Sequence, residues 1–371
     1  MNKKEAAGAL RRVCEGSKDE IGELCTWISK NSLLSEKYLF DDLCLAVERL
    51  ATESDEIDLE QLNNHLDGRP DSFLAAFFTD YKISEVIDLD CARIGPASGL
   101  VNDVPPEIVH REWPNEPSML MILTGHPAQG RLGAMRTAAW MQTILGAIGL
   151  VAYSKSGSIS PVAASPGFSS AVFFSASDLE TYPIERIALP APSIGPESLD
   201  ELLAEPDGRQ LLLDATARVP SDLAQRRLTQ AVWWLHLAST TISTADALVA
   251  LGIALETLTG DDSKQHVVEK VTKRAAVFAA DSADPHERAD VFYEQLKKAL
   301  EYYDLRSRAA HGRYDHWNED EARIDGLRSD FHRFVCDVAL GFRGHTRARN
   351  MRDVDDLMRW WKRVGIEGIF A

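Results

Sequence analysis

The C-terminal third of the chain is organised around residues 286–312, which read HERADVFYEQLKKALEYYDLRSRAAHG. The stretch follows a proline, Pro285, and ends on a glycine, Gly312, and these residue types favour the two boundaries of a helix. Within it, one set of positions recurs at intervals of four and three, which is the spacing of one face of an α-helix. These positions are Phe292, Leu296, Ala299, Tyr303, Arg306 and Ala310. An arginine therefore stands on a face that we expect to be buried.

Four more helices are predicted around this one, over residues 221–238, 243–260, 263–280 and 319–342. Ser221 is suited to cap the first of them, and Ser243 or Thr244 the second. The last carries one apolar face, made of Ile324, Leu327, Phe331, Phe334, Val335 and Val338. Five helices with short connections predict an antiparallel bundle over residues 220–343.

The rest of the chain is less uniform. Residues 1–68 have helical apolar spacing and predict a helical N-terminal segment. Residues 69–189 mix prolines with short apolar runs, such as 119–123 and 171–174, which predict strands. The fold class is therefore mainly α, with a C-terminal helical bundle, an N-terminal helical segment and an α/β middle section.

Three further segments complete the predicted organisation. The apolar stretch 137–153 is expected to be a buried helix that runs into a strand. Residues 190–219 are expected to be a linker, because the prolines of PAPSIGP at 190–196 suit neither a helix interior nor a central strand. Residues 344–371 are basic and contain Trp360 and Trp361. They predict a final amphipathic helix, and an RNA-contacting arm is the alternative.

Composition limits the function classes. The 371 residues include 40 Lys and Arg against 57 Asp and Glu, a formal charge of −17, which argues against coating nucleic acid by bulk charge. Five cysteines without a C-x-x-C pair argue against a disulfide frame or a cysteine zinc site and fit a reducing cytoplasm. The charged start is followed by no apolar signal segment, and residues 137–153 are short for a membrane span, so we expect no membrane association.

Charged residues on apolar faces are the candidate functional groups. Arg306 and His311 form an R-x4-H motif, although short motifs recur by chance. Arg274 lies in a stripe with Val271 and Phe278, and Glu256 shares a face with Val249 and Ile253. Glu256 and Arg274 have two interpretations of similar weight, a buried ionic network that fixes helix register or a functional role. For Arg306 the neighbouring His311 favours function.

Three blocks, ALVALGIALETL at 247–258, TKRAA at 272–276 and YDLRSRAAHG at 303–312, together resemble the HEPN superfamily, specifically its Apea-like branch. The resemblance covers residues 220–343 and implies a helical homodimer in which two R-x4-6-H motifs meet and cut RNA without a metal. It assigns Arg306 and His311 to the motif. Ser307 takes the position after the arginine, where Asn, Asp or His is frequent in active members and Ser is usual in this branch.

Many members of the superfamily act as toxins or in antiphage defence and abortive infection. The resemblance therefore implies a cytoplasmic defence or toxin endoribonuclease. It does not extend to residues 1–215, for which the hypothesis is a sensing or regulatory region that responds to a phage or cellular factor. No cofactor is expected, because the bundle sequence has no His, Cys or carboxylate cluster with metal-ligand spacing.

The residue types fit this chemistry independently. Metal-free RNA cleavage needs a base, an acid and a cation; imidazole can serve as base or acid, and the guanidinium fork can bind the charged phosphorane. His311 at a helix C-terminus is near carbonyl groups that favour its protonated form. Five helical residues rotate by about 140°, so Arg306 and His311 converge only if the helix ends between them, if Arg306 reaches around, or if a partner subunit supplies one of them.

Residues near the motif could hold RNA. Arg308, Arg313 and Tyr314 offer donors and a ring for phosphate and base contacts, although Arg308 could instead pair with Asp304. Two rival hypotheses stay open. In one the bundle is a non-catalytic HEPN dimer that serves as an interaction or ligand-binding module. In the other the α/β middle section is the enzyme and the bundle assembles it.

Overall fold

The computed structural model describes residues 72–78, 83–89, 92–100, 119–124, 131–157, 168–175, 187–190, 199–217, 222–241, 243–260, 266–280, 287–312, 321–348, 356 and 359. This part of the chain is mainly helical, as predicted. Within these ranges no helix combines the length and the apolar character needed to cross a bilayer. The predicted N-terminal segment, residues 1–68, lies outside the described residues.

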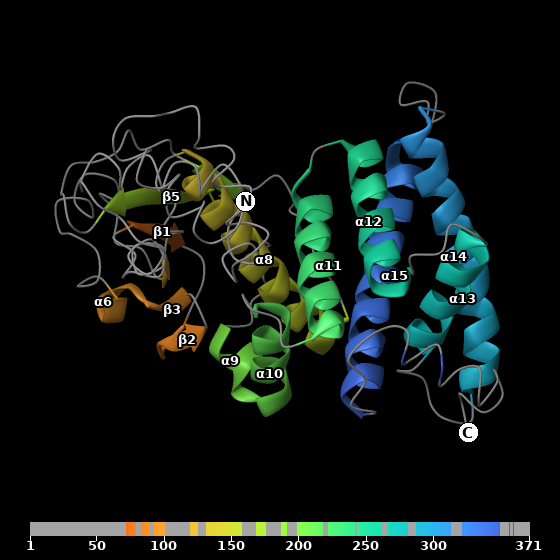
Figure 1. The fold of residues 1–371 in the computed structure, drawn as a ribbon, viewed down its shortest axis with the longest axis horizontal. Helices are drawn as coiled ribbons and strands as arrows, with labels where there is room; N and C mark the ends of the chain where they lie inside the picture. The colour runs from red at the N-terminus through yellow and green to blue at the C-terminus, as the bar shows by residue number, and fades with distance from the viewer. Residues whose placement is uncertain are drawn as a thin grey trace, which may run out of the picture. The chain divides into compact units, whose positions relative to one another are not determined.

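The chain divides into two compact units, one made of residues 1–75, 123–138 and 172–185, the other of residues 76–122, 139–171 and 186–371. The second unit contains the candidate site. Its C-terminal part is a bundle of five long helices, shown in green to blue in Figure 1. They are α11 (Leu223–Thr240), α12 (Thr244–Thr259), α13 (Val267–Ala280), α14 (Arg288–Ala310) and α15 (Glu321–Ala348).

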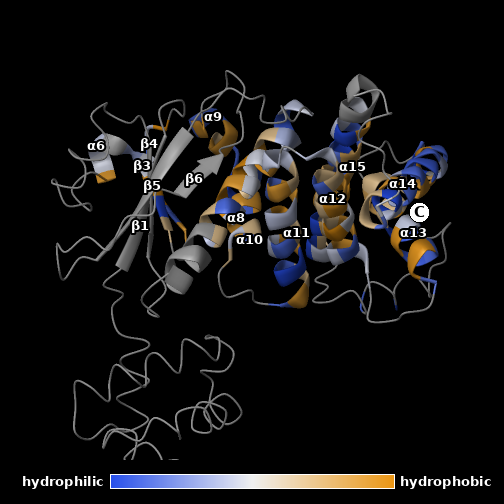
Figure 2. Cartoon of the chain, turned by 90° about the horizontal axis from the view of Figure 1, so that it is seen from above, coloured by the Kyte–Doolittle hydropathy of each residue, from blue (hydrophilic) through white to orange (hydrophobic). Residues whose placement is uncertain are grey.

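The centre of the bundle is α12, which packs against α11, α14 and α15, while α13 packs against α14 and α15. Alanine and leucine dominate α12, and most of its residues are buried. Figure 2 shows the contrast between the largely hydrophobic α12 and the hydrophilic surface of α14. Burial of a helix on several sides is what a sequence without a strongly polar face predicts.

The helix boundaries follow local chemistry. The Ser243 hydroxyl accepts a hydrogen bond from the backbone N–H of Asp246, which confirms the predicted cap of α12. The cap of α11 is Asp222, whose carboxylate accepts from the N–H of Gln225 at 2.8 Å, one residue after the predicted Ser221. α15 continues six residues past its predicted end, because Phe342 and Thr346 extend its buried face.

Six described strands form a sheet in the order β2-β3-β4-β1-β5-β6, which confirms strand structure in the middle section. They are β1 (Ser72–Phe78), β2 (Ile87–Leu89), β3 (Ala92–Pro96), β4 (Met119–Thr124), β5 (Phe168–Ser175) and β6 (Ile187–Pro190), with a single helical turn, α6 (Ala97–Leu100), after β3. The pairs β2–β3 and β5–β6 are antiparallel, with Ile87 opposite Ile94 and Phe168 opposite Pro190.

One prediction about the apolar stretch 137–153 is wrong. The whole stretch lies in a single helix, α8 (Arg131–Ser156), and does not run into a strand. The buried residues Met141, Ile144, Leu145 and Ile148 follow the 3-4 spacing of a helix, and the same spacing continues to Val151. The Tyr153 hydroxyl on α8 then donates a hydrogen bond to Asp337 on α15 at 2.7 Å.

The predicted linker, residues 190–219, also differs from the structure. It contains two helices, α9 (Leu199–Ala204) and α10 (Pro206–Ala215). Leu202 and Leu211 are buried, and Pro206 stands in the first turn of α10, where a missing N–H costs nothing. Pro206 therefore starts a helix within the segment predicted to be a linker.

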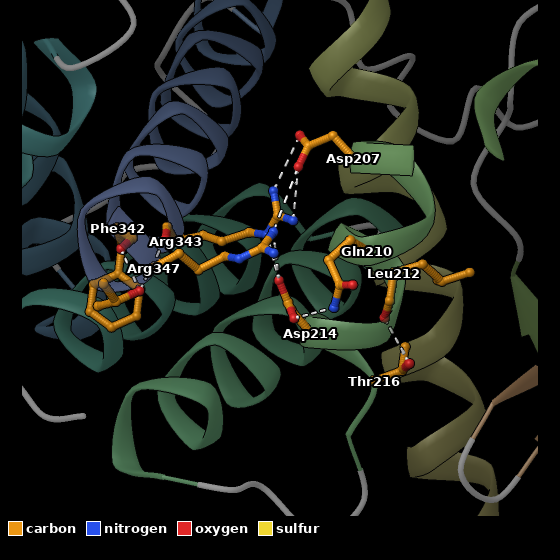
Figure 3. A network of polar contacts seen from close by, with 9 residues as sticks. Asp207, Gln210, Leu212, Asp214, Thr216, Phe342, Arg343 and Arg347 are labelled. Atoms are coloured by element: carbon orange, nitrogen blue, oxygen red, sulfur yellow. Dashed lines mark hydrogen bonds and ion pairs between the residues drawn. The ribbon is translucent and has the colours of Figure 1, made fainter. Parts of the chain in front are cut away.

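Charged residues join α10 to α15. The Arg343 guanidinium donates to Asp214 at 2.8 Å and to both carboxylate oxygens of Asp207 at 3.0 and 3.3 Å (Figure 3). Arg347 lies one turn further along α15 and approaches the same two aspartates at 3.6–3.7 Å. The buried side chain of Arg343 thus has its charge balanced by two carboxylates.

Candidate functional site

Glu256, Tyr303 and Arg306 form a polar cluster where α12 faces α14. The Arg306 Nη2 donates to Oε2 of Glu256 at 3.1 Å, and the Tyr303 hydroxyl donates to Oε1 of the same carboxylate at 2.7 Å. The guanidinium carbon of Arg306 lies 5.7 Å from the centre of the Tyr303 ring, within cation–π range. The cluster therefore combines an ion pair, a hydrogen bond from a phenol to a charged carboxylate, and a ring contact.

The backbone of α12 is shaped for this contact at Gly252. A Cβ atom at that position would overlap Cγ of Arg306 and lie 3.0 Å from its Cβ and Cδ. The arginine stem lies against the helix where only a glycine leaves room. Gly252 is one turn before Glu256, so the same face of α12 supplies both the space for Arg306 and its carboxylate partner.

The cluster is partly open to solvent. The side chains of Arg306 and Glu256 are 23% and 28% exposed. Burial and the hydrogen bond to Glu256 raise the pKa of Tyr303 to about 12, although the charge of Arg306 opposes this rise. The phenol consequently keeps its proton at neutral pH and remains a donor to Glu256. The Nε atom of Arg306 is buried and has no hydrogen-bond partner among the described residues.

His311 lies apart from this cluster. α14 is continuous through Ala310, and His311 is its C-cap, with its backbone N–H donating to the carbonyl of Ser307 at 3.1 Å. Gly312 follows with a φ of +63°, the left-handed conformation that ends many helices. The His311 side chain is exposed, while Arg306 faces α12. The helix does not end between the two motif residues, so it does not bring them together within one copy.

The other predicted site residues have mixed outcomes. Ser307 and Arg308 are half-buried on the last turns of α14. Arg313 and Tyr314 lie outside the described residues, so their predicted RNA contacts stay predictions.

Arg274 has a different partner from the one considered in the ionic-network interpretation. It is buried on α13, and its Nη1 donates to the backbone carbonyl of Thr259 at 2.5 Å. Arg227 of α11 similarly donates to the carbonyls of Thr257 and Gly260 at 2.9 and 2.8 Å. Both arginines therefore satisfy carbonyl groups at the C-terminus of α12, where a helix leaves acceptors unpaired and favours positive charge. Glu256 pairs with Arg306 and Tyr303 instead.

Tyr303 and Gly252 are the members of the cluster that the sequence reasoning did not assign to a site. The sequence pattern places Tyr303 on the apolar face of its helix and gives it no role in a site. Its position three residues before Arg306 puts the two side chains on neighbouring turns of one face. That spacing was a usable signal. Nothing in the sequence around Gly252 shows that an arginine from a helix fifty residues away needs the space.

Comparison of the chain with protein-family models, with curated proteins and with solved structures finds no match. The described residues include no group of three or more His, Cys, Asp or Glu side chains able to hold a metal ion. The candidate functional groups of the described residues are therefore those of the α12–α14 cluster and of the end of α14.

Proposed function

We propose that the C-terminal bundle is a HEPN-type endoribonuclease that acts as a homodimer, in a cytoplasmic defence or toxin system whose N-terminal region responds to a phage or cellular factor. The observation that carries the proposal is the placement of two candidate groups near one end of α14. A partly exposed guanidinium, Arg306, is oriented by fixed partners, and an exposed imidazole, His311, follows at the helix C-terminus. Their divergence within one copy is the reason for expecting a site completed by a second copy.

The proposed reaction follows from these groups. One imidazole takes the proton of a 2′-hydroxyl, the 2′-oxygen attacks phosphorus, and the bond from phosphorus to the 5′-oxygen breaks as a second imidazole, from the other copy, protonates that oxygen. The products are a 2′,3′-cyclic phosphate and a 5′-hydroxyl. Arg306 stabilises the charge on the phosphorane oxygens.

The deciding experiment compares two histidines of the full chain. His311→Asn removes a group that can exchange protons, and we expect RNA cleavage in EDTA to fall by about 10²–10⁴-fold with folding and dimerisation retained. His266→Asn is the matched control, because His266 is also exposed, lies at the start of α13 and has a positive φ that asparagine accepts. Equal cleavage by both variants and by the parent chain would contradict the proposal.

A second candidate function has one observation in its favour. Glu256 partly neutralises Arg306 at 3.1 Å, as expected if the arginine only joins α12 to α14. The bundle would then be a non-catalytic dimerisation or ligand-binding module. A dimer in light scattering that does not cut single-stranded or structured RNA would favour this candidate, whereas a fully active monomer would contradict both.

A further inference from the structure

The contacts of Glu256 are divided between two donors. A carboxylate can bind the side of a guanidinium through both of its oxygens, which accept from Nε and one Nη atom together. Here Oε2 accepts from Arg306, through Nη2, while Oε1 accepts from the Tyr303 hydroxyl and not from the guanidinium. The Nε of Arg306 correspondingly lacks a partner among the described residues. The ion pair is therefore held by one hydrogen bond where its two groups could form two.

This division affects how many N–H groups Arg306 has left to donate to another anion. A two-bond pair with Glu256 would hold the guanidinium more tightly and satisfy more of its N–H groups. In the observed arrangement, the only described residue that accepts from the guanidinium is Glu256. The part-exposed side chain of Arg306 can thus receive a second acceptor from solvent.

We propose that Tyr303 is a positioning residue that keeps the Glu256–Arg306 pair weak, so that Arg306 stays available to a phosphate group of RNA. The proposal rests on the function proposed above and concerns the regulation of the same site. Tyr303 acts through Glu256: its hydroxyl occupies one carboxylate oxygen, and Glu256 competes with the phosphate through the other. Tyr303 contacts both Glu256 and Arg306. In this proposal the carboxylate of Glu256 lowers the affinity for RNA, and the guanidinium of Arg306 raises it.

Two substitutions separate this role from a purely structural one by the sign of their effects. Glu256→Gln removes the competing charge, so RNA affinity should rise by about threefold to tenfold. Tyr303→Phe frees Oε1 to accept a second N–H of Arg306, so RNA affinity should fall by about twofold to fivefold. If Glu256 and Tyr303 only supported the packing of α12 on α14, both substitutions would shift RNA affinity in the same direction, or neither would shift it.

The measurement is fluorescence anisotropy with the full chain and a labelled 2′-O-methyl RNA, which cannot be cut by 2′-hydroxyl attack. Glu269→Gln is the matched control for Glu256→Gln. Glu269 also pairs with a cation, Lys273 at 2.6 Å, and its substitution changes the net charge equally, but its side chain is 57% exposed and lies on α13, outside the α12–α14 cluster. We expect its affinity to equal that of the parent chain. Thermal unfolding of each variant reports whether the bundle is retained.

The double variant Glu256→Gln with Arg306→Gln distinguishes the two proposals. It removes both charges together, so it leaves no uncompensated charge between α12 and α14. If the double variant binds RNA as tightly as Glu256→Gln does, Arg306 is not a phosphate contact and the proposed function fails at this residue. If the double variant binds RNA more weakly than Glu256→Gln, while Glu256→Gln and Tyr303→Phe do not shift affinity in opposite directions, the role of Tyr303 alone is overturned.

Discussion

Two arginines of the bundle pair with carboxylates in different ways. Arg343 on α15 is 8% exposed and donates through Nε, Nη1 and Nη2 to two aspartates of α10. Arg306 on α14 is 23% exposed and donates through Nη2 alone to one glutamate. A buried guanidinium whose donors are used on three atoms has little left for a ligand, whereas one with a single carboxylate bond keeps donors for another anion. The difference distinguishes a structural arginine from a candidate binding arginine.

The largest expected effect is a loss of stability at low pH, caused by two buried histidines, His236 on α11 and His332 on α15. The pKa of His236 on α11 and that of His332 on α15 are both lowered from 6.5 to about 4, by burial in His236 and by burial together with the charges of Arg328 and His236 in His332. A folded-state pKa below the unfolded one means that this stability is complete above pH 6.5 and is lost as the pH falls toward 4. The loss amounts to about 3 kcal/mol for each histidine.

Urea unfolding between pH 7 and pH 4.5 measures this loss. His236→Leu removes one buried imidazole, neither of whose ring nitrogens has a hydrogen-bond partner among the described residues. We expect the variant to lose less stability across this range than the parent chain. If the free energy of unfolding depended equally on pH in the variant and in the parent chain, His236 would not be buried as a neutral group. Solvent would then reach the interface between α11 and α15.

The next effect concerns Arg343, whose guanidinium donates through all three of its nitrogen atoms. Arg343→Ala leaves the partly buried Asp214 without its closest cation and removes the buried stem of Arg343, so the free energy of unfolding should fall by about 3 kcal/mol in urea titrations. Arg347→Ala is the control, because that side chain is 50% exposed and lies at 3.6–3.7 Å from the same aspartates. It should cost less than about 1 kcal/mol. Similar losses for both would show that burial does not separate these two arginines.

The bundle was the most predictable part of the fold, since periodic apolar residues and polar caps are local signals. Ser243 before α12 and the Phe292-to-Arg306 face of α14 were both found in this way. α9 and α10 were missed because the prolines of the segment indicated a linker, whereas α10 packs against α9 and α11 and leucines from both helices are buried.

The candidate site was predictable only in its residue types. The sequence placed Glu256, Arg274 and Arg306 on inward faces, but it could not tell which of them meet. Arg274 finds the carbonyl of Thr259, a partner that no sequence pattern displays because every residue has a carbonyl. The separation of Arg306 from His311 depends on where α14 ends, a boundary that sequence locates only to within a few residues.

The smallest expected effect is that of Arg306→Ala, and it decides whether Arg306 and Arg343 differ in role. If Glu256 were paired with Arg274 in the interior, loss of either partner would cost several kcal/mol. Glu256 is instead 28% exposed and keeps the Tyr303 hydroxyl as a donor when Arg306 is removed. Arg306→Ala should therefore lower the free energy of unfolding by only about 1 kcal/mol, a third of the loss for Arg343→Ala.

Urea titrations of the two variants at pH 7 compare these two losses. A loss for Arg306→Ala as large as that for Arg343→Ala would mean that Arg306 is a structural residue, and the non-catalytic module would become the better account of the bundle.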